Sequence, residues 1–392
     1  MARLPAGRRL HCSMVSFLRR GTAVGLLVAV SSCGVFSSDC ALTDGGCDPL
    51  IGYLSTQRWP YCFETTNVPY PLFLSGTESV IAGQASAFDN LDGVGTAARF
   101  QAPRGLATDC VSLFAFDQFN HNVRRIDLAT NTVTTLAGST SSPTGTSGSA
   151  DGVGTAASFA SPRGGAATER YVYVADTGNH TIRQIDKENG NTITIAGSAG
   201  SGAYVDGPGS SARFNFPASI AVVGQNLYIA DQNNFAVRRL SLKDLSVITF
   251  AGGTQGTTDG VGTSAQLDGI VAGIATDGTN LYLPDSANHI IRRINLATAQ
   301  VTTIAGQVGV TGTTDAVGTA ALFNSPRGAV SDGLTLYVAD RNNSSIRTIN
   351  LTTLAVGTLI SGLATAPEGD PAVTLNRLYY GGYTLATINV VQ

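Results

Sequence analysis

Short apolar segments recur along this chain at a fixed spacing and predict a repeating β-structure. Residues 83 and 138 close two of these segments and are 55 residues apart, as are residues 197 and 252. Six segments end in Ala-Gly or a near copy of it, and their closing glycines are Gly83, Gly138, Gly197, Gly252, Gly306 and Gly362. A repeat of this length that cannot bury its own apolar face must stack on its neighbours.

The second repeat predicts four short strands. Pro162-Arg-Gly164 introduces an innermost strand near residues 164–168, and further strands cover 171–176, 182–186 and 192–197. Turns rich in glycine and asparagine separate them, which is typical of a propeller blade. The strands are apolar almost throughout, which indicates sheets covered on both faces. An aromatic column expected in the core between blades comprises Phe114, Tyr173, Tyr228, Tyr282, Tyr337 and Tyr379.

The two ends of the repeat array are offset, and this offset predicts a closed ring. The Ala-Gly segments begin at residue 83, before any Leu-Tyr segment, whereas the Leu-Tyr segments end at residue 379, after the last Ala-Gly. We therefore predict an all-β fold, a six-bladed β-propeller of four-stranded blades. Its N-terminal outer strand, Ser79–Gly83, would pair with C-terminal inner strands within residues 367–391. Burial of Val80 and Ile81 would contribute roughly 3–6 kcal/mol to closure.

The turn after the second strand resembles that of the NHL repeat family, which is named for its Asn-His dipeptide. The sixth repeat departs from the pattern, because Gly382 takes the place of the aspartate. The turns read Asp117-Gln-Phe-Asn-His121, Asp176-Thr-Gly-Asn-His180, Asp231-Gln-Asn-Asn-Phe235, Asp285-Ser-Ala-Asn-His289 and Asp340-Arg-Asn-Asn-Ser344. The resemblance covers residues from about 75 to 392. It implies a propeller that serves as a binding platform for other proteins; some members of the family bind RNA through basic faces.

Composition and charge narrow the class of partner. Charged residues make up 13% of the 392-residue chain, and 46 glycines fit a turn-rich all-β protein. The formal net charge is −3, so the chain lacks the basic excess that marks nucleic-acid binding. We expect a monomer that binds no nucleic acid.

The first 33 residues read as a targeting signal. Arg19 and Arg20 precede ten apolar residues, fewer than the roughly 20 that span a bilayer. Val30-Ser-Ser-Cys33 then resembles the bacterial lipobox, which implies cleavage before Cys33 and its acylation. Several acyl chains make such an anchor stable. Ordinary secretion with cleavage nearby is the alternative. Residues 1–13 fit the signal poorly, which favours translation from Met14.

This signal sets the expected domains and location. Residues 1–32 are the signal peptide, 33–74 a lipidated cysteine, spacer and short cap, and 75–392 the propeller. We expect an exported protein of the bacterial cell envelope, attached to the membrane by its lipid alone. Four cysteines remain for disulfides in that oxidising compartment, and sequence does not choose among their three pairings. They are Cys40, Cys47, Cys62 and Cys110.

We interpret the repeated polar residues as structural. Three histidines, His121, His180 and His289, share one repeat position, which is also filled by phenylalanine or serine, so a metal site is not required there. An arginine follows each turn aspartate by seven residues, and a hairpin can bring the two side chains together as a structural ion pair. The pairs are Asp117 and Arg124, Asp176 and Arg183, Asp231 and Arg238, Asp285 and Arg292, and Asp340 and Arg347.

The loops between blades contain Asp-Gly-Val-Gly or a near copy, as at Asp151-Gly-Val-Gly154. One aspartate per loop is too few for calcium, which takes six to eight oxygen ligands, so a turn is expected. These loops and the Asn-His turns should emerge on one face. Three arginines of the Pro-Arg-Gly step share it: Arg104, Arg163 and Arg327.

We interpret the chain as a lipid-anchored binding module that presents this face, including the three histidines, to a protein or glycan. No catalytic residues, cofactor or metal are expected. The alternative is a calcium- or zinc-dependent enzyme, such as a lactonase-like hydrolase or a lyase with ligands in the central channel. That alternative depends on fold analogy alone. A purely architectural envelope protein is a third reading.

Overall fold

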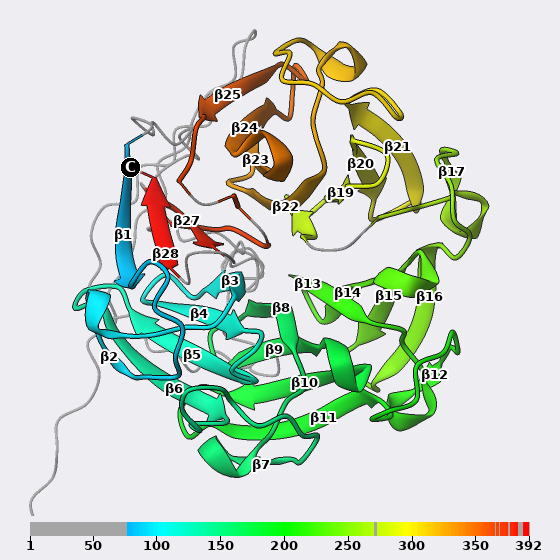
Figure 1. The fold of residues 1–392 in the computed structure, drawn as a ribbon. Coiled ribbons are helices and arrows are strands. Elements are labelled where there is room, and N and C mark those ends of the chain that lie inside the picture. The colour runs from blue at the N-terminus through cyan, green and yellow to red at the C-terminus, as the bar shows by residue number, and fades with distance from the viewer. Residues whose placement is uncertain are drawn as a thin grey trace, which may run out of the picture. The chain divides into compact units, whose positions relative to one another are not determined.

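The computed structural model describes residues 77–269, 273–364, 366–367, 369–374, 377–382 and 387–391. Within these residues the strands form six antiparallel sheets, arranged as blades around a central axis (Figure 1). All of them lie in the unit that spans Gln57–Gln392. The predicted signal peptide, the lipidated cysteine, the spacer and Cys40, Cys47 and Cys62 lie outside the described residues.

Blades 1 to 3 each contain four long strands and a two-residue outer strand. Blade 1 comprises β3 (Pro103–Thr108), β4 (Ser112–Asp117), β5 (Asn122–Asp127), β6 (Thr132–Gly138) and the outer β2 (Gly93–Val94). Blade 2 comprises β8 (Pro162–Ala167), β9 (Tyr171–Asp176), β10 (Thr181–Asp186), β11 (Asn191–Gly197) and the outer β7 (Gly152–Val153). Blade 3 comprises β13 (Pro217–Val223), β14 (Asn226–Asp231), β15 (Ala236–Ser241), β16 (Ser246–Gly252) and the outer β12 (Gly207–Pro208).

The remaining sheets vary in strand number. Blade 4 comprises β18 (Ala275–Thr276), β19 (Asn280–Asp285), β20 (Ile290–Asn295), β21 (Gln300–Ala305) and the outer β17 (Gly260–Val261). Blade 5 comprises β22 (Pro326–Ser331), β23 (Thr335–Asp340), β24 (Ser345–Asn350) and β25 (Val356–Ile360). The terminal sheet comprises β26 (Ala372–Thr374), β27 (Arg377–Gly382), β28 (Thr387–Val391) and β1 (Glu78–Gly83).

Single 3-10 turns connect these strands. Five follow the loops between blades and three form the turns after the second strand of a blade. The first group is η1 (Gly95–Ala97), η2 (Gly154–Ala156), η4 (Gly209–Ser211), η6 (Gly262–Ser264) and η7 (Gly318–Ala320). The second group is η3 (Thr177–Asn179), η5 (Gln232–Asn234) and η8 (Arg341–Asn343).

Strand register places the repeated turns and loops on one face. In blade 2, Pro162 pairs with Asp176 and Gly197 pairs with Thr181. The start of the inner strand, the turn after the second strand and the loop leaving the outer strand therefore share one side of the propeller. We call this side the turn face, defined by residues 117–121, 176–180, 231–235, 285–289 and 340–344.

The hydrophobic core lies between blades. Phe114 and Phe116 of β4 pack with Phe159 and with Val172 of β9, and all four are buried. Each middle strand is covered on both sides, which explains why nearly every residue of β4 and β9 is apolar. The predicted aromatic column lies in this core, since none of its six residues exceeds 5% exposure.

The inner strands touch through their backbones. A Cβ on Gly105 would lie 2.4 Å from the carbonyl oxygen of Arg163, and one on Gly164 would lie 2.6 Å from that of Ala218. Glycine is therefore required at this step by the close approach of neighbouring blades. In β13 the same register position is Ser219, which pairs with Ala230 as Gly164 pairs with Ala175.

The prediction of uniform four-stranded blades is wrong. Four of the six described sheets have five strands, because a Gly-Val or Gly-Pro pair from the preceding loop adds to the outer edge. This addition covers the outer strand, whose free backbone groups would otherwise face solvent. Only five sheets carry the full repeat. The terminal sheet has Gly382 at the aspartate position and no fifth strand among the described residues.

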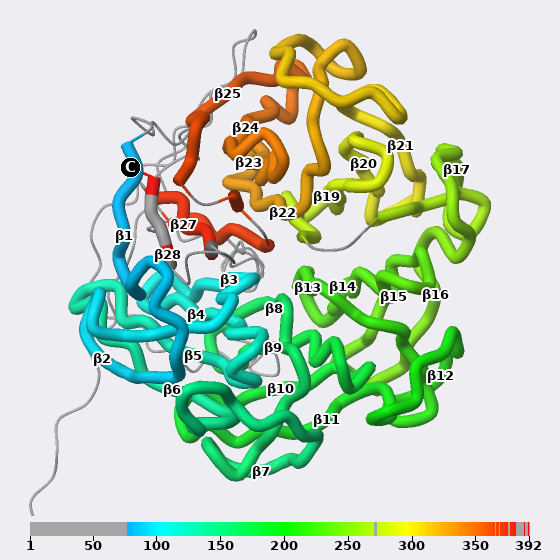
Figure 2. Tube along the Cα trace, viewed as in Figure 1, coloured from blue at the N-terminus to red at the C-terminus, as the bar shows by residue number. Residues whose placement is uncertain are grey.

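The expected basis of ring closure is also wrong. β1 pairs with β28, from Glu78 opposite Val391 to Gly83 opposite Thr387 (Figure 2). Yet Val80 is 46% exposed and Ile81 is only partly buried, whereas the small Ala82 is fully buried. A break in register between Val80 and Ala82 changes the direction of the side chains there. Burial of Val80 therefore does not stabilise this pairing.

Candidate binding face

A buried ion-pair network links each loop between blades to the turn that follows it. In blade 2, Arg183 Nη1 lies 2.7 Å from Asp176 Oδ2, and Arg183 Nη2 lies 2.8 Å from Asp151 Oδ1. Arg183 is fully buried and lies 5.0 Å from the centre of the Phe159 ring. Burial raises the pKa of Asp176 to about 6, against the opposing effect of Arg183. The network recurs as Asp92–Arg124–Asp117, Asp206–Arg238–Asp231, Asp259–Arg292–Asp285 and Asp315–Arg347–Asp340.

In four of the five turns, the asparagine holds the loop that leads into its own blade. Asn179 Nδ2 donates to Asp176 Oδ2 at 2.8 Å and to the Gly148 carbonyl at 2.7 Å. Asn120, Asn234 and Asn343 make the same pair of contacts. The structure therefore uses the repeated aspartate, asparagine and arginine to fix turns and loops, and none of the five networks is arranged as an open catalytic pair.

The three histidines connect successive blades. The backbone N–H groups of Ser161, Phe216 and Ser325 donate to Nδ1 of His121, His180 and His289 at 3.0, 3.1 and 3.0 Å. Each donor directly precedes a Pro-x-Gly or Pro-x-Ser step and has a positive φ, between 51° and 56°. Burial lowers the pKa of His121 and of His180, so the neutral ring that accepts this bond is favoured.

Sequence reasoning missed this contact between blades. Phe235 is followed by a blade without a Pro-x-Gly step, but Ser344 is followed by Pro367-Glu-Gly369 and His180 by Pro217-Ala-Ser219. The step by itself therefore does not mark the repeats that contain histidine. The histidines stand on the turn face, as expected, with one ring nitrogen used by the neighbouring blade.

The arginines of the Pro-Arg-Gly step lie at the start of inner strands on the turn face. Arg104 Nη1 donates to Gln118 Oε1 at 3.2 Å, within blade 1. Arg163 Nη1 donates to Gln232 Oε1 at 2.9 Å, reaching from blade 2 to the turn of blade 3. Arg327 takes the same position in β22. All three are partly exposed. They lie in blades 1, 2 and 5, so the side chains on the inner part of this face differ from blade to blade.

The channel axis is occupied by the segment that leads into β26, which sequence reasoning did not single out. Asp370 accepts from Ser219 Oγ at 2.7 Å, and the Ile274 N–H donates to Ser219 Oγ at 3.1 Å. The Leu106 N–H donates to the Asp370 carbonyl at 2.9 Å. Among the described residues, Asp370 Oδ1 is buried without a hydrogen-bond partner, and burial raises the pKa of Asp370 to about 7. Asp370 thus joins blades 1 and 3 to the terminal sheet, through its backbone carbonyl and its carboxylate respectively, and Ser219 extends this contact to blade 4.

Comparison with known proteins agrees with this architecture. No protein-family model matches the chain. The chain is 29% identical over 301 residues to NHL repeat-containing protein 2 of Homo sapiens, covering 68% of this chain and 41% of that protein. It is 31% identical over 280 residues to the chloroplastic protein SUPPRESSOR OF QUENCHING 1 of Arabidopsis thaliana, covering 66% of this chain and 26% of that protein. The chain spans less than half the length of either relative.

Solved structures share the fold at low identity. A Bacteroides thetaiotaomicron protein of unknown function superposes with a TM-score of 0.60 and 18% identity, covering 80% of this chain and 74% of that one. An auxiliary nutrient binding protein from the same species gives 0.58 and 14%, covering 80% and 76%. Sequence and fold together support an NHL-type β-propeller.

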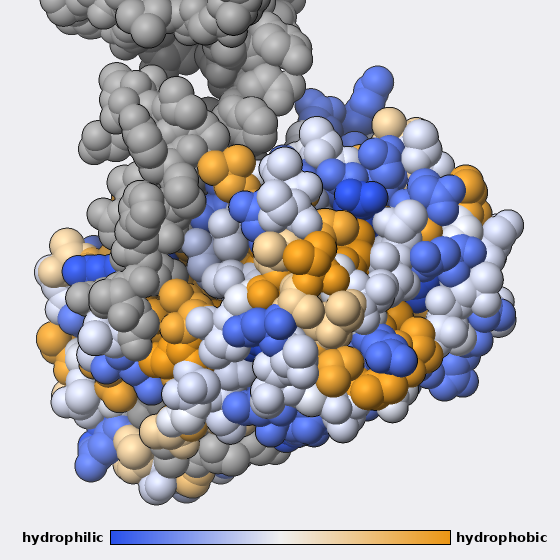
Figure 3. Space-filling model, turned by 90° about the horizontal axis from the view of Figure 1, so that it is seen from above, coloured by the Kyte–Doolittle hydropathy of each residue, from blue (hydrophilic) through white to orange (hydrophobic). Residues whose placement is uncertain are grey.

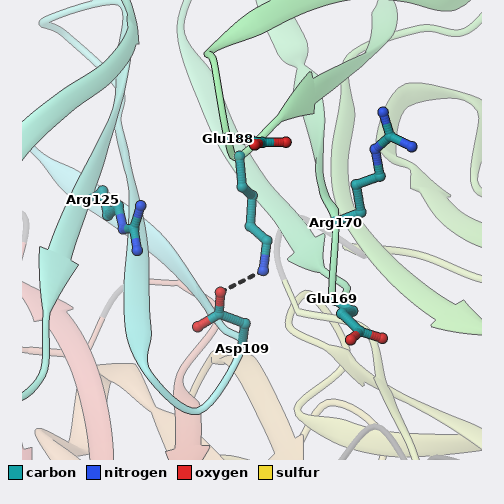
Figure 4. Close-up of a pocket in the computed structure, with 6 residues that line it drawn as sticks. Asp109, Arg125, Glu169, Arg170 and Glu188 are labelled. Carbon is teal, nitrogen blue, oxygen red and sulfur yellow. Dashed lines mark hydrogen bonds and ion pairs between the residues drawn. The ribbon is translucent and has the colours of Figure 1, made fainter. Parts of the chain in front are cut away.

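The face of the propeller opposite the turn face has a small charged cleft. Its volume is about 310 Å³, and Lys187 extends across it to pair with Asp109 (Figure 4). The lining residues are Asp109, Arg125, Glu169, Arg170, Lys187 and Glu188. Three acidic and three basic side chains balance one another, so the cleft does not favour a ligand of either charge.

Cys110 lies in the turn between β3 and β4, beside this cleft, and is disulfide-bonded. It is the one cysteine among the described residues, so its partner lies outside them. Glu78 begins β1 at the same side, because the other end of β1, Gly83, lies at the turn face. The chain therefore enters the propeller on the face opposite the turn face, and a disulfide is attached to that face as well.

The outer edge of the propeller carries exposed valines from the Asp-Gly loops. Val94, Val153, Val261 and Val317 are between 54% and 63% exposed. Seen from the edge, apolar residues form several separate patches between polar ones (Figure 3). Isolated apolar side chains of this kind are common on soluble proteins and do not indicate a partner.

Neither a metal cluster nor a membrane-spanning helix is found in the described part of the chain. No group of three or more histidine, cysteine, aspartate or glutamate side chains is placed there to hold a metal ion. None of its helices has the length and apolar character needed to cross a bilayer.

Proposed function

We propose that this protein is a lipid-anchored, extracytoplasmic binding module whose turn face receives a protein or glycan partner. The observation that carries the proposal is the difference between repeats at this face. The repeated aspartates and buried arginines form the same internal network in five blades, whereas the partly exposed Arg104, Arg163 and Arg327 occur in only three. Binding residues are expected on loops that a rigid scaffold positions.

The comparisons support a binding role at the level of the fold. Among structures that share it, one is described as an auxiliary nutrient binding protein. NHL repeat-containing protein 2 is among the relatives similar in sequence. That the partner of this chain is a protein or a glycan belongs to the proposal.

Attachment on the opposite face supports display of the turn face. The chain enters β1 on that side, and Cys110 is disulfide-bonded there. A tether to Cys33 through this side would leave the turn face directed away from the membrane. Metabolic labelling with a palmitate analogue tests the anchor. Label on the wild type that is absent from Cys33→Ala supports it, whereas an unlabelled wild type contradicts it.

Charge reversal tests the face. The full-length protein and the triple variant R104E/R163E/R327E would be used to capture partners from intact envelopes, followed by mass spectrometry. Loss of the captured partner in the triple variant, with unchanged thermal unfolding, supports the proposal. Arg170→Glu on the opposite face is the matched control, because the Arg170 side chain is 68% exposed. Equal capture by the triple variant would exclude the turn face.

The enzyme alternative places ligands at the channel axis. In the structure, Asp370 and Ser219 bond to each other at that position. Metal analysis of the purified protein distinguishes the two functions, because a stoichiometric, chelator-resistant calcium or zinc ion would favour the enzyme.

A further inference from the structure

The loop between blades 1 and 2 is an insertion relative to the repeat. Twelve residues, 139–150, separate Gly138 from Asp151, whereas six or eight residues fill this interval in the other four full repeats. The loop contains eight serines and threonines and no charged residue. The repeat folds without such a lengthening elsewhere in the same chain, so the insertion is not needed to build a blade.

The inserted loop is held firmly at its base. Asn90 Nδ2 donates to the carbonyls of Ser139 and Ser141 at 3.0 and 3.1 Å, and Asn122 Nδ2 donates to that of Ser139 at 2.7 Å. A Cβ on Gly145 would lie 1.8 Å from the Asn120 carbonyl, so the loop lies directly on the turn of blade 1. The loop backbone is therefore held in place on the turn face.

Several hydroxyl groups of this loop are available to a ligand. Thr140, Thr144, Ser147 and Ser149 are exposed, and their side chains make no hydrogen bond to other described residues. Each hydroxyl can donate one hydrogen bond and accept two. The loop therefore offers a dense group of neutral donors and acceptors.

The loop that precedes blade 1 supplies an exposed aromatic residue and a carboxylate that bonds to the inserted loop. Phe88 is 47% exposed in the loop that precedes blade 1. Next to it, Asp89 Oδ1 accepts from Ser142 Oγ at 2.6 Å and from the Asn90 N–H at 2.7 Å. Asn120 Nδ2 donates to the Asp89 carbonyl at 2.8 Å. The Ser142 hydroxyl bond is the main cause that lowers the pKa of Asp89, so this carboxylate is ionised at neutral pH.

The combination fits a sugar better than a peptide. A pyranose presents an apolar face of C–H groups, which an exposed aromatic ring can cover, and a rim of hydroxyls that donate to a carboxylate and exchange hydrogen bonds with serine and threonine. Few precisely placed polar groups around an apolar contact are the usual features of a small-ligand site. The rigid base keeps the entropic cost of binding low.

We propose that the loops 84–92 and 139–150 form a glycan-binding site on the turn face, with Phe88 as the stacking residue and Asp89 as the hydroxyl acceptor. This inference rests on the proposed function and names glycan as the class of partner. The site adjoins Arg104 through the turn of blade 1, since Arg104 bonds to Gln118 and the inserted loop covers Asn120.

Soluble polysaccharides test the site directly. Affinity electrophoresis and titration calorimetry would measure binding of the full-length protein to β-glucan, xylan, pectin and solubilised peptidoglycan. We expect at least one of these to bind, and Phe88→Ala and Asp89→Asn each to weaken that binding about tenfold or more, as the loss of one well-placed contact implies. Binding should change little at about 0.5 M salt, because neutral hydrogen bonds and stacking are not screened.

Phe216→Ala is the matched control, because Phe216 is another exposed aromatic residue of the turn face, at 37%, in a different blade. It should bind polysaccharide as the wild type does. Equal binding by Phe88→Ala and the wild type, or no binding of any of the four polysaccharides to the wild type, would overturn the inference. If the arginine-dependent capture from envelopes succeeds in that case, the proposed function stands and the partner is a protein. If capture also fails, both proposals are wrong.

Discussion

Ser219 and Asp370 form a hydrogen bond of 2.7 Å across the channel axis, although they are 151 residues apart in the chain. Ser219 takes the position that glycine has in β3 and β8, and Asp370 leads into β26 of the terminal sheet. Because the Ile274 N–H also donates to Ser219, this one hydroxyl joins three sheets. At the centre of the propeller, the polar contact between Ser219 and Asp370 is thus surrounded by close backbone contacts between the inner strands.

Asp370→Asn should change the pH dependence of stability. Burial raises the pKa of Asp370 from 3.8 to about 7, so between these values the folded protein binds more protons than the unfolded chain. The contribution of this group to stability is therefore complete below pH 3.8 and is lost as pH rises through about 7. We expect Asp370→Asn to be more stable than the wild type at pH 8, by on the order of 2–4 kcal/mol.

Urea unfolding at several pH values measures this difference. The gap between Asp370→Asn and the wild type should widen from pH 5 to pH 8. A gap that is constant over this range would show that Asp370 does not titrate there, and that its carboxylate is already solvated or paired.

Ser219→Gly restores the residue that the neighbouring inner strands use. The backbone contacts of the channel should survive, but the buried Asp370 carboxylate and the Ile274 N–H would lose their shared partner. We expect a loss of about 1–3 kcal/mol in the free energy of unfolding. In a double-mutant cycle with Asp370→Asn, the two effects should be non-additive, because the residues are in direct contact. Simple additivity would contradict the bridging role.

Periodicity made much of the architecture predictable from the chain alone. Asp176 and Arg183 were paired from their seven-residue spacing, because a tight hairpin must bring them together and four further copies repeat the spacing. Arg183 has a second partner, Asp151, which was identified as a turn residue but not as a partner of Arg183. That contact depends on the path of the loop between blades, which spacing does not define.

The features that were missed depend on contacts that form only after the ring has assembled. Ser219 meets Asp370 across the axis, and nothing local connects them. The fifth strands were missed because a Gly-Val pair within a turn has no strand pattern of its own. Val80 was expected to be buried because it is apolar, but the register break beside it leaves it 46% exposed.

Removal of Arg183 should strongly destabilise blade 2. Arg183→Met would leave Asp176 buried without its cation and remove the bonds to the Ser158 and Ala150 carbonyls. A loss of about 3–5 kcal/mol is expected, as when one partner of a buried pair is deleted. Arg183→Lys should recover only part of it, because an ammonium group cannot reproduce the forked contacts.

The exposed pair on the opposite face provides the comparison. Arg170→Met breaks an ion pair with Asp186 in which the arginine side chain is 68% exposed. Its cost should be much smaller than that of Arg183→Met, because water and salt screen an exposed ion pair. Thermal unfolding of both variants measures the contrast, and equal costs would mean that the buried network does not stabilise the blade.

His180→Phe tests the connection between blades 2 and 3, using the side chain that blade 3 has in the same position. The Phe216 N–H would lose its acceptor, Nδ1 of His180, at a cost of about 1 kcal/mol.

The effect of this variant should depend on pH. Burial lowers the pKa of His180 below its usual 6.5, so the unfolded chain takes up a proton more readily. The stability supplied by the neutral ring is present above pH 6.5 and is lost as pH falls through the lowered pKa. The difference between wild type and His180→Phe should therefore shrink between pH 7 and pH 5. If it grows instead, the Phe216 N–H bond to Nδ1 is not what stabilises the fold, because a protonated ring has no acceptor at that nitrogen.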